Sequence, residues 1–147
     1  MPGIVSAIRG GPGSRPTIER TIQLAKETGQ EIYFIYIVNV DFLSHTAVSR
    51  VQALIEELTE MGEFILLHAR ETASSKGVSA QGVVRKGNVR QEITKLCGEL
   101  NASYLVLGRP AGGEKKDTFD SEAIENFQET VERETGARVI FAGGDSQ

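Results

Sequence analysis

The stretch Ile32-Tyr33-Phe34-Ile35-Tyr36-Ile37-Val38 decides the fold class. Each of its residues is β-branched or aromatic, and such side chains favour β-strands. They do not alternate with polar residues, as the residues of a strand with one face in water would. A continuously apolar strand is typical of a parallel sheet covered by helices on both faces. We therefore expect a buried parallel strand here, with a helix on either side of it in the sequence.

On the N-terminal side, the sequence predicts one more strand and a helix. Ile4 to Ile8 is a short apolar run that ends in the turn residues Arg9 to Ser14, which is the pattern of a buried strand. Ser14 is a candidate N-cap for the next helix, and Gly29 a candidate stop. Residues of helical spacing lie between them, namely Ile18, Ile22 and Ala25.

On the C-terminal side, a long helix is expected from about Ser44 to Ser75. Its apolar stripe steps by threes and fours and consists of Val48, Val51, Ile55, Leu58, Gly62, Ile65 and Ala69. Such a stripe is compatible with a coiled coil or with a helix lying on a sheet. Gly62 weakens a coiled-coil seam, which favours the helix on a sheet.

A weaker strand and another helix follow. The strand is expected from Val78 to Arg85, interrupted by Gly82. Asn88 and Gln91 have the spacing of a capping box, in which each side chain bonds to the backbone near the other. The helix that they begin has one apolar face, formed by Ile93, Leu96, Cys97 and Leu100.

The rest of the chain contains two strands and one helix. Ser103 to Leu107 is an apolar run closed by Gly108, and Arg109 to Thr118 is rich in loop residues. The last helix has Ile124, Phe127 and Val131 on its apolar face, and a fifth strand covers Val139 to Ala142. Alternation of strand and helix along a chain predicts an α/β fold with an open, five-stranded parallel sheet and helices on both faces.

Composition limits the class of protein. The 147 residues fit a single domain, residues 1–147, and the net charge of −4 argues against a nucleic-acid binder, which needs a basic surplus. The longest apolar run is far shorter than the ~20 residues of a membrane span, so no membrane insertion is expected. With one cysteine, Cys97, no internal disulfide can form. We expect a soluble, cytoplasmic protein.

Metal and catalytic sites are not expected. His45 and His68 are far apart in the sequence, without a carboxylate or cysteine at ligand spacing. Cys97 lies on an apolar helix face, where thiols are usually inert. No nucleophile with a matching base can be defended, which favours a protein that is not an enzyme; weak nucleotide hydrolysis stays an alternative.

Three stretches, in order, resemble the universal stress protein family. Thr17 to Tyr33 is similar to the family's first helix entering its second strand. Val84 to Ile93 resembles its third strand, a glycine turn and the next helix, and Leu100 to Gly108 resembles its fourth strand and glycine. The resemblance runs from about Ile4 to Ala142. It implies the strand order 3-2-1-4-5, an adenine nucleotide alpha hydrolase-like fold and a homodimer.

The resemblance also implies a candidate site above the carboxyl ends of strands 1 and 4, where one branch of the family binds ATP. That branch carries an aspartate near the end of strand 1, whereas this chain has Arg9. It also carries Gly, two residues, Gly, nine residues, Gly and then Ser or Thr after strand 4. Gly108 matches the first position, but Ala111, Ser121 and Glu122 stand at the others. We therefore expect no cofactor, with ATP as the alternative.

The candidate cleft consists of Ile8, Arg9, Gly10, Ile37, Gly108, Arg109, Ser121 and Glu122. Within it we expect Arg9 to pair with Asp120 or Glu122. The Gly-rich segment 10–14 can be interpreted as a phosphate cradle, but it lacks the order of either phosphate-binding glycine motif, which favours a tight connection. Lys115 and Lys116, with Arg109, could clamp a phosphate in another pose; a solvated loop is the alternative.

Three functions remain open. The first is a non-catalytic stress-response or regulatory module that acts through an unidentified protein partner and through a homodimer. The homodimer is expected to pair the fifth strand, Arg138 to Ala142, whose edge no proline or lysine protects. The second is a nucleotide-binding sensor with an altered pocket. The third is a regulatory domain or partner of a membrane transporter.

Overall fold

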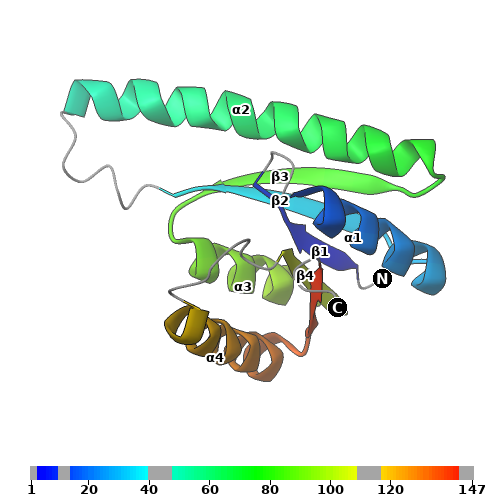
Figure 1. Ribbon diagram of the computed structural model, residues 1–147. Helices are drawn as coiled ribbons and strands as arrows, with labels where there is room; N and C mark the ends of the chain where they lie inside the picture. The colour runs from blue at the N-terminus through cyan, green and yellow to red at the C-terminus, as the bar shows by residue number, and fades with distance from the viewer. Residues whose placement is uncertain (1–2, 10–13, 40–47, 109–116, 143–147) are drawn as a thin grey trace.

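Strands and helices alternate along the part of the chain that the structure describes (Figure 1). In chain order they are β1 (Ile4–Ala7), α1 (Arg15–Thr28), β2 (Ile32–Val38), α2 (Val48–Ser75), β3 (Ala80–Lys86), α3 (Val89–Leu100), β4 (Tyr104–Gly108), α4 (Asp117–Thr135) and β5 (Arg138–Ala142). The computed structural model describes residues 3–9, 14–39, 48–108 and 117–142, except the side chains of 48–49 and 117–124. The strands pair in parallel in the order β3-β2-β1-β4-β5, which confirms the predicted fold class.

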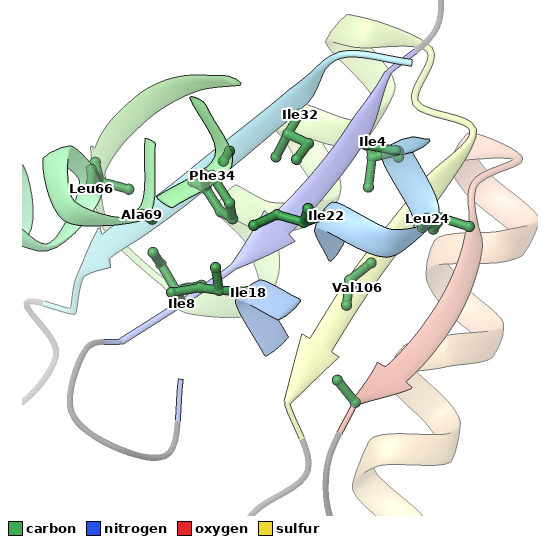
Figure 2. Packing of buried hydrophobic residues seen from close by; sticks show 13 residues of the cluster. Ile4, Ile8, Ile18, Ile22, Leu24, Ile32, Phe34, Leu66, Ala69 and Val106 are labelled. Atoms are coloured by element: carbon green, nitrogen blue, oxygen red, sulfur yellow. The ribbon is translucent and has the colours of Figure 1, made fainter. Parts of the chain in front are cut away.

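The two faces of the sheet have separate hydrophobic cores. Phe34 of β2 belongs to the core beneath α1 and α2, with Ile22 and Leu66 (Figure 2). The next residue, Ile35, belongs to the core beneath α3 and α4, with Leu96. Because successive side chains of a strand point to opposite faces, a strand with helices on both faces must be apolar at every position. This is why β2 does not alternate.

Helix α2 lies on the sheet along β2 and β3 (Figure 1), as the favoured interpretation of its stripe predicts. Gly62 and Ala69 of the stripe are buried against the sheet. The side chain of Val48 lies outside the description. The other residues of the stripe are half-buried, namely Val51, Ile55, Leu58 and Ile65.

Two glycines allow the close approach of α2. A Cβ atom on Gly62 would lie 2.3 Å from Cδ2 of Tyr36, and one on Gly82 would lie 3.2 Å from Cβ of Leu66. The prediction that Gly82 interrupts the third strand is therefore wrong, since β3 runs unbroken from Ala80 to Lys86. This glycine makes room for the helix.

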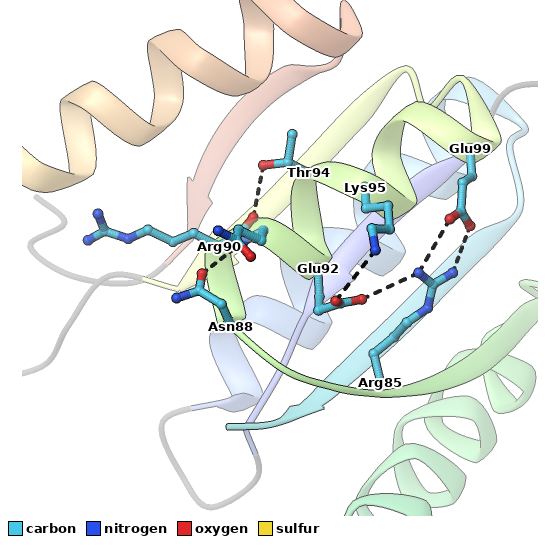
Figure 3. Close-up of polar contacts among 8 residues, drawn as sticks. Arg85, Asn88, Arg90, Glu92, Thr94, Lys95 and Glu99 are labelled. Atoms are coloured by element: carbon cyan, nitrogen blue, oxygen red, sulfur yellow. Dashed lines mark hydrogen bonds and ion pairs between the residues drawn. The ribbon is translucent and has the colours of Figure 1, made fainter. Parts of the chain in front are cut away.

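The helix ends follow the sequence signals with two exceptions. One is the predicted capping box of α3, which is half formed, since the described structure contains the bond to the Asn88 side chain but none from the Gln91 side chain back to Asn88 N–H. Asn88 caps α3 by accepting a hydrogen bond from Gln91 N–H at 3.0 Å (Figure 3), and Gly29 ends α1 with a φ of 72°. The other exception is Ser14, which makes no capping bond to α1, and that prediction is wrong. Its backbone is already helical, with φ −86° and ψ −15°, whereas a capping side chain needs an extended backbone. Its hydroxyl instead accepts Arg9 N–H at 3.2 Å.

Candidate functional site

The direction of strand order changes between β1 and β4, which are neighbours in the sheet. Helix α1, which follows β1, packs on one face, and α4, which follows β4, contributes Val131 to the core of the opposite face. Helices that leave neighbouring strands on opposite faces open a crevice at the carboxyl ends of those strands. The fold therefore places the candidate site at the ends of β1 and β4.

Ile8 and Arg9 follow the last residue of β1 and differ in burial. Ile8 is buried, and its N–H donates to the Ile35 carbonyl at 3.1 Å. The side chain of Arg9 is exposed. Ile37 packs against the core beneath α3 and α4, whereas Ile8 packs beneath α1 and α2. Of these predicted site residues, Ile8 and Ile37 thus belong to opposite faces of the sheet.

Gly108 ends β4 in close contact with α1. A Cβ atom at this position would lie 2.7 Å from Oγ1 of Thr17, which is shorter than real Cβ contacts allow. Thr17 is itself buried beneath the helix. The requirement for glycine at 108 therefore follows from helix–sheet packing, without any ligand.

Sequence reasoning missed a row of buried hydroxyl groups that connects α1 to β1. Ser6 Oγ and Thr21 Oγ1 lie 2.8 Å apart, and Thr21 Oγ1 donates to the Thr17 carbonyl at 2.7 Å. Because Thr21 has a single hydroxyl proton, Ser6 is the donor of the first bond. The signal in the sequence is two threonines four residues apart in α1, a spacing that places them on one helix face.

The side chains of the remaining predicted site residues lie outside the part of the chain that the structure describes. Gly10 and Arg109, with Ala111, Lys115 and Lys116, lie outside the described residues. Ser121 and Glu122 belong to α4 by their backbone, but their side chains, like that of Asp120, lie outside the description. The ion pair of Arg9 with Asp120 or Glu122 stays a prediction, because both carboxylate side chains lie outside the description.

A charged network connects β3 to α3 (Figure 3). The Arg85 guanidinium lies 2.7 Å from Glu99 and 3.5 Å from Glu92, and Lys95 Nζ lies 3.8 Å from Glu92. The hydrogen bond to Glu99 raises the pKa of Arg85 and lowers that of the Glu99 carboxyl. The network connects the end of β3 to successive turns of α3 through side chains that are partly exposed.

Cys97 and His68 are the thiol and the histidine that the structure describes, and they lie in different parts of the fold. Cys97 is buried in the core beneath α3 and α4, and burial raises the pKa of its thiol to about 12, so it is protonated at neutral pH. His68 is exposed on α2, and His45 lies outside the described residues. Among the residues that the structure describes, no three His, Cys, Asp or Glu side chains gather as metal ligands.

Two surface hollows lie away from the ends of β1 and β4. One, of about 470 Å³, lies between α3 and α4, where Arg90 sits 5.7 Å from the ring centre of Phe127. The other, of about 450 Å³, lies beside Glu31, at the end of the sheet where β2 and β3 begin. No described helix is long and apolar enough to cross a membrane.

Comparisons with known proteins agree with this fold. The model of the universal stress protein family matches residues 2–137. A universal stress protein of Methanocaldococcus jannaschii is 28% identical over 106 residues, which cover 71% of this chain and 62% of that relative. This chain therefore spans less than two thirds of the length of that relative.

Solved structures show the same architecture. UspA from Lactobacillus plantarum has a TM-score of 0.77 and 10% identity, with 97% of each chain covered. A family member from Burkholderia pseudomallei has a TM-score of 0.69 and 17% identity, covering 94% of this chain and 92% of its own. A universal stress protein from Archaeoglobus fulgidus, solved in complex with dAMP, has a TM-score of 0.64 and 14% identity, covering 97% and 98%. This chain belongs to the universal stress protein family.

Proposed function

We propose that this protein is a non-catalytic regulatory module of the stress response that acts through dimerisation and contacts with other proteins. Membership of the family supports the role in stress. A cytoplasmic location is part of the proposal, since the one cysteine, Cys97, is a buried thiol.

The observation that carries the proposal is the end of β1. Arg9, with an exposed side chain, stands where the ATP-binding branch carries an aspartate that accepts from adenine. A guanidinium has only donors, so it cannot replace this acceptor. Gly108, which matches the family's phosphate pattern, already has Thr17 beside it. We infer that ATP does not bind in the family's usual pose.

Charge at the phosphate end supports the same inference. Glu122 stands where the pattern has a hydroxyl that donates to phosphate. Two unit negative charges about 4 Å apart repel by about 4 kcal/mol at an effective dielectric constant of ~20. A micromolar affinity corresponds to about 8 kcal/mol, so this repulsion would remove a large part of it.

A thermal-shift titration with Mg-ATP tests this proposal. A ligand at about 100 times its Kd stabilises a protein by about 2.7 kcal/mol, which raises the Tm of a domain of this size by several degrees. We expect no rise for this protein at millimolar Mg-ATP. The Archaeoglobus fulgidus protein, solved with dAMP, is the positive control with that nucleotide.

A nucleotide-binding sensor is the second candidate. It is favoured by similar proteins that were solved with bound cAMP, dAMP or AMP. The same titration with AMP and cAMP separates the two candidates. If AMP or cAMP raises the Tm, and the size of this rise differs in the Arg9→Asp protein, the protein is a nucleotide-binding sensor and the first proposal is wrong. Gly108→Val is unsuitable as a control, because the contact with Thr17 alone predicts destabilisation.

The proposed dimer pairs β5, which ends the strand order, with its own symmetry mate. The outer edge of β5 has a backbone donor that is already bonded within the chain. Arg138 N–H donates toward β4, to the Ser103 carbonyl, so Val139 N–H points outward, and it is occupied by Glu132 Oε2 at 3.1 Å. Pairing along β5 must replace this bond.

Light scattering tests the dimer. We expect twice the 16.0 kDa chain mass at micromolar concentration, and at least as much dimer for Glu132→Ala, which frees the Val139 donor. A mass of one chain for both proteins would contradict the proposed dimer.

A further inference from the structure

Helix α2 presents three large apolar side chains to solvent. Met61 is 53% exposed, Phe64 72% and Leu67 47%. Residues three apart lie on the same side of a helix, so these side chains form one patch, the α2 outer patch. Single exposed apolar residues are ordinary, whereas a group on one face marks an interaction surface.

The opposite side of the same turns is fixed to the sheet. Gly62 lies against Tyr36, where even a Cβ atom would come within 2.3 Å of the ring. Leu66 and Ala69 are buried in the core beneath α2. The sheet therefore already covers one side of these turns, and a rotation that buried Phe64 would expose this core. A rigid backing also lowers the entropy lost when a partner binds.

Negative charge surrounds the α2 outer patch. Five carboxylates of the helix are exposed, namely Glu56, Glu57, Glu60, Glu63 and Glu71. No ion pair found among the described residues involves α2. Arg70 donates to the Ala80 carbonyl of β3 at 3.2 Å, which directs its guanidinium toward the sheet. Complementary charge guides the choice of partner, so an apolar patch inside an acidic rim fits a basic amphipathic segment.

A second copy of this chain fits the α2 outer patch poorly. An antiparallel two-fold contact centred on Phe64 places residues at equal distances on either side of it opposite each other. Glu57 and Glu71, seven residues before and after Phe64, would then face each other across the contact twice. Like charges placed opposite each other disfavour such pairing.

We propose that the α2 outer patch is a docking surface for a basic amphipathic helix of a partner protein. The partner would insert apolar side chains at helical spacing between Met61, Phe64 and Leu67, with lysines or arginines toward the acidic rim. This inference names the chemistry of the partner and rests on the proposed function, in which the protein acts through protein contacts.

The test uses the full chain and a defined probe. The probe is a labelled peptide of about 18 residues, long enough for several helical turns, with leucines on one face and lysines elsewhere. A scrambled peptide of the same composition and a version with glutamate for lysine are the controls. We expect the first peptide to bind at least about tenfold more tightly than either control in fluorescence anisotropy.

Protein variants locate the binding. Phe64→Ser and Leu67→Ser should each weaken binding about tenfold, with little change in Tm because both side chains are exposed. Val89→Ser is the matched control, since Val89 is 37% exposed on α3, and it should bind as the original chain does. Replacing Glu57, Glu60 and Glu63 with Gln should weaken binding and reduce its dependence on salt.

Two kinds of outcome would overturn the proposal, namely the loss of an expected difference in binding and self-association through the patch. One is equal binding by the Phe64→Ser and Val89→Ser proteins, or equal binding of the ordered and scrambled peptides. The other is self-association that Phe64→Ser abolishes, which would assign the patch to a second copy. Binding of Mg-ATP would contradict the proposed function but would leave these readouts unchanged, so the two failures are distinguishable.

Discussion

The hydroxyl group of Thr17 on α1 lies where a side chain at position 108 would have to project, 2.7 Å from the place of a Cβ atom. Gly108 is also the position that matches the family's phosphate-binding pattern. Its glycine is thus explained by packing at the end of β4. The match of Gly108 to the phosphate-binding pattern is therefore no evidence of a phosphate site, because helix packing alone favours glycine at this position.

Gly108→Ala should destabilise the protein by about 1–3 kcal/mol, the usual effect of overpacking. The reason is the contact with Thr17 Oγ1. Thr17→Ala removes this atom, so the double variant should lose less stability than the sum of the single variants. Urea unfolding of the four proteins measures the coupling. Additive effects would mean that the two residues do not compete for this space.

Gly62→Ala should destabilise the protein even though alanine favours helices over glycine by about 1 kcal/mol. Its Cβ atom would lie 2.3 Å from the Tyr36 ring, and we expect the resulting overpacking of about 1–3 kcal/mol to exceed the gain. The matched control is Gly98→Ala in α3, where the nearest atom, Cγ2 of Thr135, lies 3.9 Å away. Gly98→Ala should raise the Tm, and a rise for both variants would contradict the close packing of α2 on β2.

Cys97 should react with thiol reagents only when the protein unfolds. The side chain is fully buried, and burial raises the pKa of the thiol to about 12, so little thiolate exists at pH 8. We expect labelling at pH 8 to be slow in buffer and rapid in urea. Rapid labelling of the folded protein would show that the core beneath α3 and α4 opens locally.

Glu31 should make stability fall at acid pH. A hydrogen bond from Gln81 at 2.9 Å lowers the pKa of this carboxyl below its usual 4.5, with smaller contributions from Ser79 and Tyr33, against partial desolvation. The unfolded chain then binds more protons near and below pH 4.5, so the free energy of unfolding decreases as pH falls through the folded pKa.

Gln81→Leu tests this relation. It removes the largest cause of the shift, so an NMR titration should show the Glu31 pKa moving up toward 4.5, with a shallower loss of stability in acid. Ser79→Ala should give the same change to a smaller extent. An unchanged Glu31 titration in the Gln81→Leu protein would rule out this hydrogen bond as the cause.

The sequence by itself determined the class of the fold and the order of its elements. The unbroken apolar run Ile32 to Val38 requires cover on both faces, and this requirement, with the alternation of strands and helices, leads to a parallel sheet. Asn88 and Gly29 mark helix ends correctly because capping depends on φ, ψ and hydrogen bonds within a few residues. Such local preferences are readable from neighbouring residues alone.

Only the tertiary structure decided which glycines and polar groups matter. The contacts of Thr17 with Gly108 and of Gly62 with Tyr36 join residues far apart in the sequence. They depend on how far each helix is shifted and rotated over the sheet, which no local pattern specifies. The same rotation of α2 that buries Leu66 leaves Phe64 in solvent. Helical spacing predicts that a stripe exists, but the packing of the helix against the sheet decides which apolar side chains remain outside it.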